Sequence, residues 1–160
     1  MRRTIGTEYP RTLVLENVVR RRIRALDPGH VRDTAVALVR DIRDSGGTPR
    51  GPLVQRLTPR ANEDHVVAHE TALMRQSATP LSPADLPPDV EVEPRVEVSD
   101  CILVRFRGDV SDLDVVYSKI NVSAYENEIE LDGTVYLVFA GEDGTSVEVD
   151  AFAPAVSREP

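Results

Sequence analysis

Two short stretches of the chain carry side chains whose types and spacing could do chemistry. In residues 146–152, the alternation of a β-strand places Glu148, Asp150 and Phe152 on one face and three small apolar residues on the other. A carboxylate in a partly apolar setting can pair with a cationic ligand, or act as a base when burial raises its pKa. The same spacing also fits a solvated sheet face with no ligand, so the pattern by itself leaves both interpretations open.

The second stretch contains His65 and His69 next to acidic residues. On a helix the two histidines would lie one turn apart and could share a zinc ion. Val66 and Val67 favour a strand, on which the two side chains share a face but lie about 13 Å apart at roughly 3.3 Å per residue. We therefore predict no metal site and no cofactor. The chain also shows no phosphate-binding glycine loop, nucleophile elbow or serine-triad order, so we favour a binding protein over an enzyme while activity stays open.

The elements that must position these residues follow one order twice. In the second half, residues 101–108 form an apolar strand, residues 110–127 a helix, and residues 134–139 and 146–152 two further strands. The predicted helix has an apolar stripe with spacings of three and four residues. It consists of Val110, Leu113, Tyr117, Ile120 and Ala124.

The first half repeats the order of strand, helix, strand and strand. Residues 13–26 are rich in β-branched residues, and residues 31–44 have helical spacing at Val31, Ala35, Leu38 and Ile42. A Ser-Gly-Gly sequence at residues 45–47 ends this helix. Residues 53–57 and 65–73 are the two following strands.

We therefore predict one α+β domain over residues 1–160, built from two tandem strand-helix-strand-strand repeats. The repeats would form a pseudo-twofold antiparallel sheet with the helices on one face and a cleft between the halves. Repeat one covers about residues 12–75 and repeat two about residues 95–156. The proline-rich residues 76–94 form the linker between them.

Charge and composition narrow the classes of partner. Residues 1–80 carry a balance of +5 and residues 81–160 a balance of −13, within a net charge of −8. The cluster of Arg20, Arg21, Arg22 and Arg24 is the candidate for nucleic-acid contact, but stacking aromatics are missing near it, so we do not expect nucleic-acid binding.

No apolar run is long enough for a membrane span, and the first six residues lack the apolar segment of a signal peptide, so we expect a soluble cytoplasmic protein. Cys101, inside an apolar strand, is expected to be buried and inert.

Several motifs resemble the GyrI-like (gyrase-inhibitor-like) effector-binding domains. In the second half these are the strand end at 103–109, the helix start at 113–117, the helix exit at 125–127 with 130–133, and the closing strands at 135–136, 146–148 and 154–156. In the first half the helix exit at 44–52 resembles the family more weakly. The family consists of tandem strand-helix-strand-strand repeats with a ligand cleft between them, and the resemblance covers about residues 12–156.

The resemblance implies a stand-alone effector-binding domain of a bacterial, cytoplasmic protein that binds a small cationic or aromatic molecule. The family's key glutamate corresponds to Glu148, and Tyr136 and Phe152 lie on the same face. Glu70 is the counterpart of this glutamate in the first repeat. Tyr117 is a further aromatic candidate, although its place on the helix stripe also suits the core. The first repeat departs from the family because it supplies no aromatic residue to the cleft. Two alternatives remain, namely an interaction or inhibitor module whose acidic second half docks a basic protein partner, and a hydrolase that uses the cleft glutamate. The oligomeric state is left open.

Overall fold

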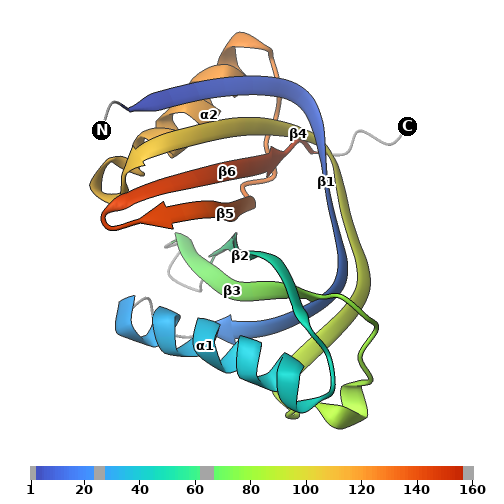
Figure 1. Cartoon of the computed structure of the whole chain (residues 1–160). Coiled ribbons are helices and arrows are strands. Elements are labelled where there is room, and N and C mark those ends of the chain that lie inside the picture. Colours follow the sequence, from blue (N-terminus) through green and yellow to red (C-terminus); the bar gives the residue numbers. More distant parts are fainter. Residues whose placement is uncertain (1–2, 24–27, 62–66, 157–160) are drawn as a thin grey trace. The chain divides into compact units, whose positions relative to one another are not determined.

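The computed structural model describes residues 3–23, 28–61 and 67–156, and it shows an α+β protein with antiparallel strands and two α-helices (Figure 1). The order of strand, helix, strand and strand occurs twice, as the sequence predicted. The elements are β1 (Thr4–Ile23), α1 (Pro28–Asp44), β2 (Pro49–Ala61), β3 (Val67–Ser77), the short 3-10 helix η1 (Pro83–Asp85), β4 (Val90–Asp109), the 3-10 helix η2 (Val110–Asp112), α2 (Val115–Glu126), β5 (Val135–Asp143) and β6 (Ser146–Pro154).

The chain divides into two compact units that are not identical with the two repeats. Unit 1 comprises Met1–Leu13 and Val98–Pro160, and unit 2 comprises Val14–Glu97. The first and fourth strands, each of 20 residues, run through both units. In unit 2 the hydrogen-bonded order is β1-β3-β2, and in unit 1 it is β4-β6-β5, with antiparallel registers in the pairs of each unit.

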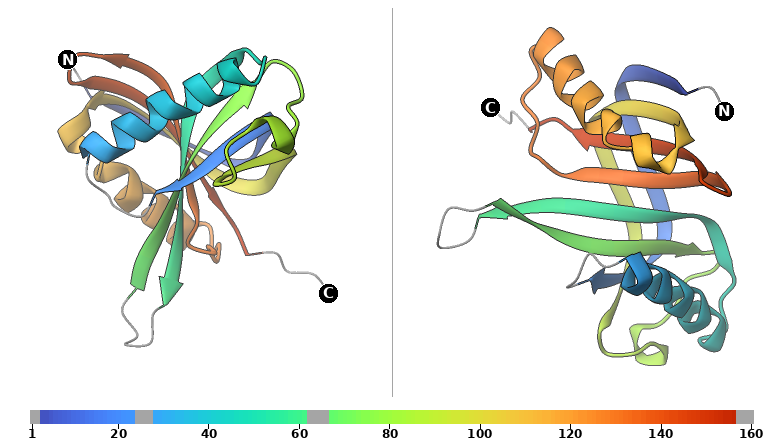
Figure 2. Two further views of the ribbon diagram at one scale, coloured as in Figure 1. Left: turned by 90° about the horizontal axis from the view of Figure 1, so that it is seen from below. Right: turned by 90° about the vertical axis from the view of Figure 1, so that its left-hand side faces the viewer.

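The core of unit 2 lies between α1 and the strands behind it (Figure 2). Leu38 and Ile42 of the predicted helix stripe are fully buried, and Val31 and Ala35 pack partly against the same cluster. The helix ends as predicted: Gly46 adopts a φ of 90°, and the backbone N–H of Gly47 donates to the carbonyl of Ile42. The other buried members of this core are Val19, Ile23, Leu73, Leu86 and Val90.

The core of unit 1 includes one face of α2, and here the predicted stripe is wrong in part. Val110 is 49% exposed and belongs to η2, whereas Val116 is fully buried. The reason is local: the Asp109 side chain accepts a hydrogen bond from Ser111 N and caps a separate 3-10 turn, so the α-helix begins later and in a different phase. Ile120 and Ala124 are buried as expected.

The connection between the repeats is shorter than predicted. The third strand extends to Ser77 and the fourth begins at Val90, so the linker spans residues 78–89 and Pro94 lies within a strand. Leu86 of this connection is 8% exposed and packs into the unit 2 core. Neither of the two described α-helices combines the length and apolarity that crossing a bilayer requires.

Candidate functional site

The sheet of unit 1 has one buried face and one partly open face. On β6, Val147, Val149 and Ala151 are at most 5% exposed, whereas Glu148 is exposed and Asp150 is half-buried. This is the alternation that the sequence predicted. The strand pairing then fixes which residues lie beside one another on the open face.

The open face changes in character along the strands. At one end, Phe152 pairs with Leu103 on β4 and with Tyr136 on β5. Phe152 and Tyr136 are half-buried, and Leu103 is 1% exposed. Towards the other end, Asp150 pairs with Arg105 and Glu148 with Arg107, so an apolar and aromatic region passes into an ionic one.

Glu148 forms an ion pair across the strands. Its Oε1 lies 3.1 Å from Arg107 Nε, and the two side chains are 48% and 58% exposed. Such an exposed pair contributes little to stability and is screened by salt. The carboxylate is therefore positioned but remains accessible to a competing cation.

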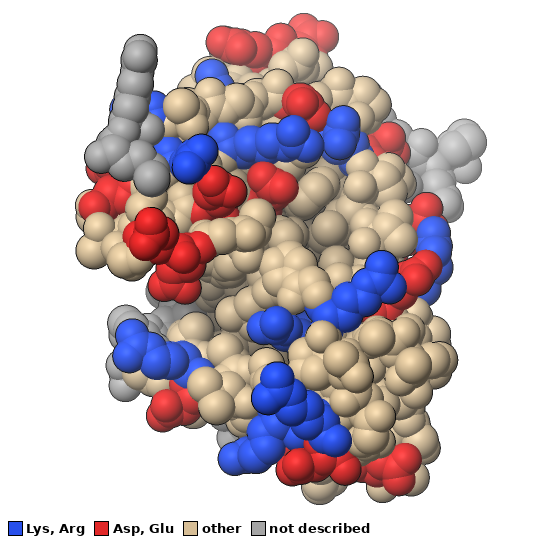
Figure 3. Space-filling model, in the orientation of Figure 1, with Lys and Arg blue, Asp and Glu red and all other residues tan. Residues whose placement is uncertain are grey.

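A shallow depression of ≈ 340 Å³ lies over this ionic end. Figure 3 shows basic and acidic side chains next to each other on this part of the surface. Neither Tyr136 nor Phe152 lines the depression, although both share its sheet face. The lining residues are Thr4, Arg105, Phe106, Arg107, Ala140, Glu148 and Asp150.

Asp150 is electrostatically different from its neighbour. Burial raises its pKa, the Arg105 guanidinium opposes this effect, and Glu148 and Glu8 raise the pKa further. A carboxyl group of this kind holds its proton to a higher pH than an ordinary aspartate does. The alternation of residues 146–152 predicts that Asp150 lies on this face, and it is the signal in the sequence from which a role for Asp150 could be inferred.

Tyr117 lies on α2 and does not line the depression. It is half-buried, and burial raises the pKa of its hydroxyl group, with Asp114 adding to the effect. These surroundings favour a role for Tyr117 in packing, which its position on the predicted helix stripe also allows.

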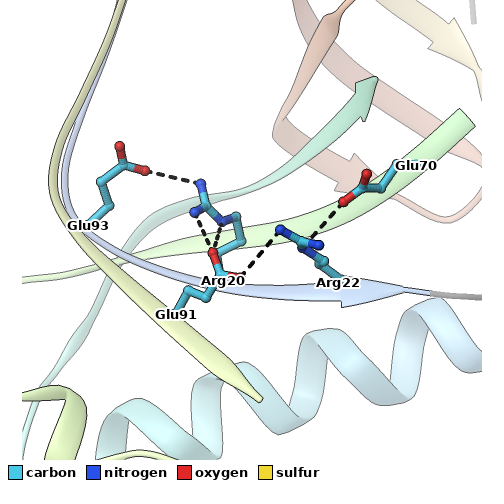
Figure 4. A network of polar contacts seen from close by, with 5 residues as sticks. All are labelled: Arg20, Arg22, Glu70, Glu91 and Glu93. Carbon is cyan, nitrogen blue, oxygen red and sulfur yellow. Dashed lines mark hydrogen bonds and ion pairs between the residues drawn. The ribbon is translucent and has the colours of Figure 1, made fainter. Parts of the chain in front are cut away.

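Glu70 lies on β3 in unit 2, where it has ionic partners of its own (Figure 4). Its Oε1 is 3.3 Å from Arg22 Nε. Arg20 lies within 2.6 Å of Glu91 and 3.1 Å of Glu93, and the hydrogen bond from Arg20 lowers the pKa of Glu91. Glu70 and Glu148 belong to different units, and the cleft between the repeats stays a prediction.

The arginine cluster predicted on the first strand is largely neutralised by acids. Arg20 and Arg22 contact the carboxylates of Figure 4, and Arg21 points to the other face, 3.1 Å from Asp41 of α1. Arg24 lies outside the described residues. Glu91 and Glu93, about seventy residues away in sequence, were not predicted to be partners, because sequence spacing contains no signal for a long-range strand pair.

The remaining candidates from the sequence are the histidines and the single cysteine. Within the described residues no three His, Cys, Asp or Glu side chains gather as metal ligands would, and His65 lies outside the described residues. Cys101 is fully buried, and burial, with Asp132 and Asp100 adding to it, raises the pKa of its thiol to about 11. The thiol is therefore shielded and protonated at neutral pH, as the sequence predicted.

Comparison with known proteins supports the fold alone. The chain matches no model of a protein family and no curated protein. Among solved structures it is similar to a hydrolase encoded by lin2189 from Listeria innocua, with a TM-score of 0.53 and 10% sequence identity over 94% of this chain and 90% of that chain. At this identity the likeness extends to the arrangement of strands and helices and not to the chemistry.

Proposed function

We propose that the protein binds a small molecule on the open sheet face of unit 1, as a stand-alone effector-binding protein of the GyrI-like type. The observation that carries this proposal is the arrangement on one face of an aromatic pair, Tyr136 and Phe152, followed by the carboxylates of Asp150 and Glu148. A ligand with a flat apolar part and a cationic group would match both ends. The family resemblance of residues 101–156 supports the same interpretation and carries with it a bacterial, cytoplasmic setting.

A cationic ligand must compete with Arg107 for the carboxylate of Glu148. A cationic group that binds Glu148 competes with the Arg107 guanidinium, which lies 3.1 Å away. Because the pair is exposed, displacing it costs about 1 kcal/mol or less. Binding therefore depends on the additional contact of a ring with the aromatic end of the face, where cation–π and stacking contacts contribute.

The test is titration with a panel of cationic aromatic dyes, followed by fluorescence anisotropy and calorimetry. We expect Glu148→Gln to weaken binding about tenfold, equivalent to about 1.4 kcal/mol. Arg107→Gln removes the competing guanidinium, so it should strengthen binding of the same dye. Phe152→Ala tests the aromatic end and should also weaken binding.

The matched control is Glu142→Gln, which removes an exposed carboxylate on β5 outside the depression. It should bind the dyes as the wild type does. If no dye binds, or if Glu148→Gln and Glu142→Gln behave alike, the ligand proposal is wrong. Pull-down of a basic protein that is lost at high salt would then support the interaction module.

A second candidate is hydrolysis, and the observation that favours it is the raised pKa of Asp150 beside Glu148. Two carboxyl groups with different proton affinities can divide the roles of acid and base. The similar structure from Listeria innocua is named a hydrolase, which agrees with this candidate without assigning a substrate. Turnover of ester or phosphoester test substrates that is lost in Asp150→Asn would favour hydrolysis over simple binding.

A further inference from the structure

The outer face of α1 in unit 2 forms a second concave surface, separate from the candidate site. A groove of ≈ 450 Å³ runs along the helix. We call it the α1 groove. It is lined by Arg32, Ala35, Val36, Val39, Arg40, Arg43, Asp44 and Arg75.

The α1 groove combines a basic rim with an apolar floor. Its four arginines outnumber its one carboxylate, that of Asp44. Val36 is 63% exposed, and the half-buried Val39 and Ala35 continue the apolar surface beside it. Figure 3 shows basic side chains gathered on this part of the molecule.

Three of the four arginines of the groove have no acidic partner among the described residues, whereas most of the other described arginines do. Within the part of the chain that the structure describes, Arg32, Arg43 and Arg75 have no carboxylate at ion-pair distance, and Arg75 Nε is buried without a hydrogen-bond partner. Arg40 reaches Asp41 only at 4.0 Å. By contrast, Arg20, Arg22 and Arg107 are all neutralised by carboxylates.

Arg43 alone has an explanation within the fold. It stands in the last turn of α1, where a cation stabilises the partial negative charge of the helix end. Arg32 is in the second turn of α1, away from that end, and Arg75 comes from β3. The helix alone therefore does not account for the set of arginines.

We propose that the α1 groove is a docking site for an acidic segment of a partner protein that carries an aliphatic side chain between its carboxylates. Guanidinium groups pair with carboxylates through two parallel hydrogen bonds, and the valine floor fits one aliphatic side chain. From Arg32 to Arg43 the helix rises about 16 Å, which an extended peptide of about five residues would span.

Two other polyanions fit the groove less well. Single-stranded nucleic acid is held by aromatic stacking as well as by charge, and none of the lining residues is aromatic. A helix that lies on an anionic membrane inserts large apolar residues, and this face offers only valine and alanine. Both remain outcomes of the test.

The probe is a dye-labelled peptide, Glu-Glu-Leu-Glu-Glu, measured by fluorescence anisotropy on the full chain at low and high salt. We expect binding that weakens with salt and that falls about tenfold in Arg43→Gln/Arg75→Gln. The peptide Gln-Gln-Leu-Gln-Gln should not bind. Val36→Ser should weaken binding with no change in charge, which separates the apolar contact from general attraction.

The matched control is Arg11→Gln/Arg95→Gln, which removes the same charge from two exposed arginines outside the groove. It should bind the peptide as the wild type does, and circular dichroism should show all variants folded. The proposal is overturned if the wild type does not bind the peptide, or if both double variants lose it equally. It is also overturned if an oligonucleotide or anionic vesicles bind through these arginines while the peptide does not.

Discussion

The carboxyl groups of Asp150 and Glu148 lie two residues apart on one strand and yet meet different surroundings. Glu148 is exposed and engaged by Arg107, whereas Asp150 is half-buried and its pKa is raised by burial in spite of Arg105. In a site of this kind the exposed group is suited to bind a cation. The half-buried group is suited to exchange a proton.

The raised pKa of Asp150 predicts a pH-dependent effect of its replacement. Folding raises this pKa above 3.8, so the folded state binds the proton more tightly than the unfolded state does. The stability that the bound proton contributes is present in acid and is lost as pH rises through the folded pKa. Asp150→Asn should therefore become more stable relative to the wild type as pH rises from acidic to neutral. The change should be less than about 1 kcal/mol, because water screens a partly exposed group.

Urea unfolding at acidic and neutral pH measures this difference. Asp143→Asn, at an exposed position at the end of β5, is the control and should show no comparable trend. A constant difference between Asp150→Asn and the wild type over this pH range would contradict the assignment.

At the scale of elements, α1 has two faces with opposite roles. Leu38 is fully buried in the core of unit 2, and Val36, two residues earlier, is 63% exposed in the α1 groove. Leu38→Ala should lower the free energy of unfolding by about 2–5 kcal/mol, because it removes buried methyl groups and leaves a cavity. Val36→Ala should change it by about 0.5 kcal/mol or less.

Thermal or urea unfolding followed by circular dichroism compares the two variants. Equal losses of stability in Leu38→Ala and Val36→Ala would mean that α1 does not pack as described. A loss confined to Leu38→Ala would leave Val36 available for contacts outside the chain.

The elements that the sequence predicted well are those whose pattern is local. The stripe with Leu38 and Ile42 and the glycines after it define α1, and the alternation of residues 146–152 defines β6. The start of α2 was predicted too early because Asp109 caps a 3-10 turn in front of it, and this turn interrupts an apolar spacing that looks continuous in the sequence.

The strand ends and the ion pairs were harder to predict. Residues 4–12 have no clear apolar alternation, so the first half of β1 was missed. Gly141 and Glu148 lie opposite each other only after a shift in register that no residue pattern announces. The sequence predicts which residues share the open face, namely Glu148, Asp150, Phe152 and Tyr136. It does not predict that Arg107 is the ionic partner of Glu148, because this contact depends on the pairing of strands far apart in the sequence.

At the scale of the whole molecule, the charge is divided between the repeats. The balance of +5 in residues 1–80 and −13 in residues 81–160 gives the chain an arginine-rich helix face and an acidic second repeat. Most individual surface pairs add little to stability, so this asymmetry acts chiefly on the choice of partners. The α1 groove, with four arginines and one carboxylate, and the depression at Glu148, with two of each, therefore differ in charge.

Each compact unit contains part of β1 and part of β4, which predicts how the chain tolerates cleavage. Unit 1 contains Thr4–Leu13 of β1, and unit 2 contains Val90–Glu97 of β4. A fragment of residues 1–80 or 81–160 alone therefore lacks part of each core and leaves strand edges unpaired.

We expect neither fragment alone to unfold cooperatively. The mixed fragments should recover a cooperative transition, because the cut lies in the connection between β3 and β4. Circular dichroism during heating measures this. A sharp transition in either fragment alone would show that a single repeat folds on its own.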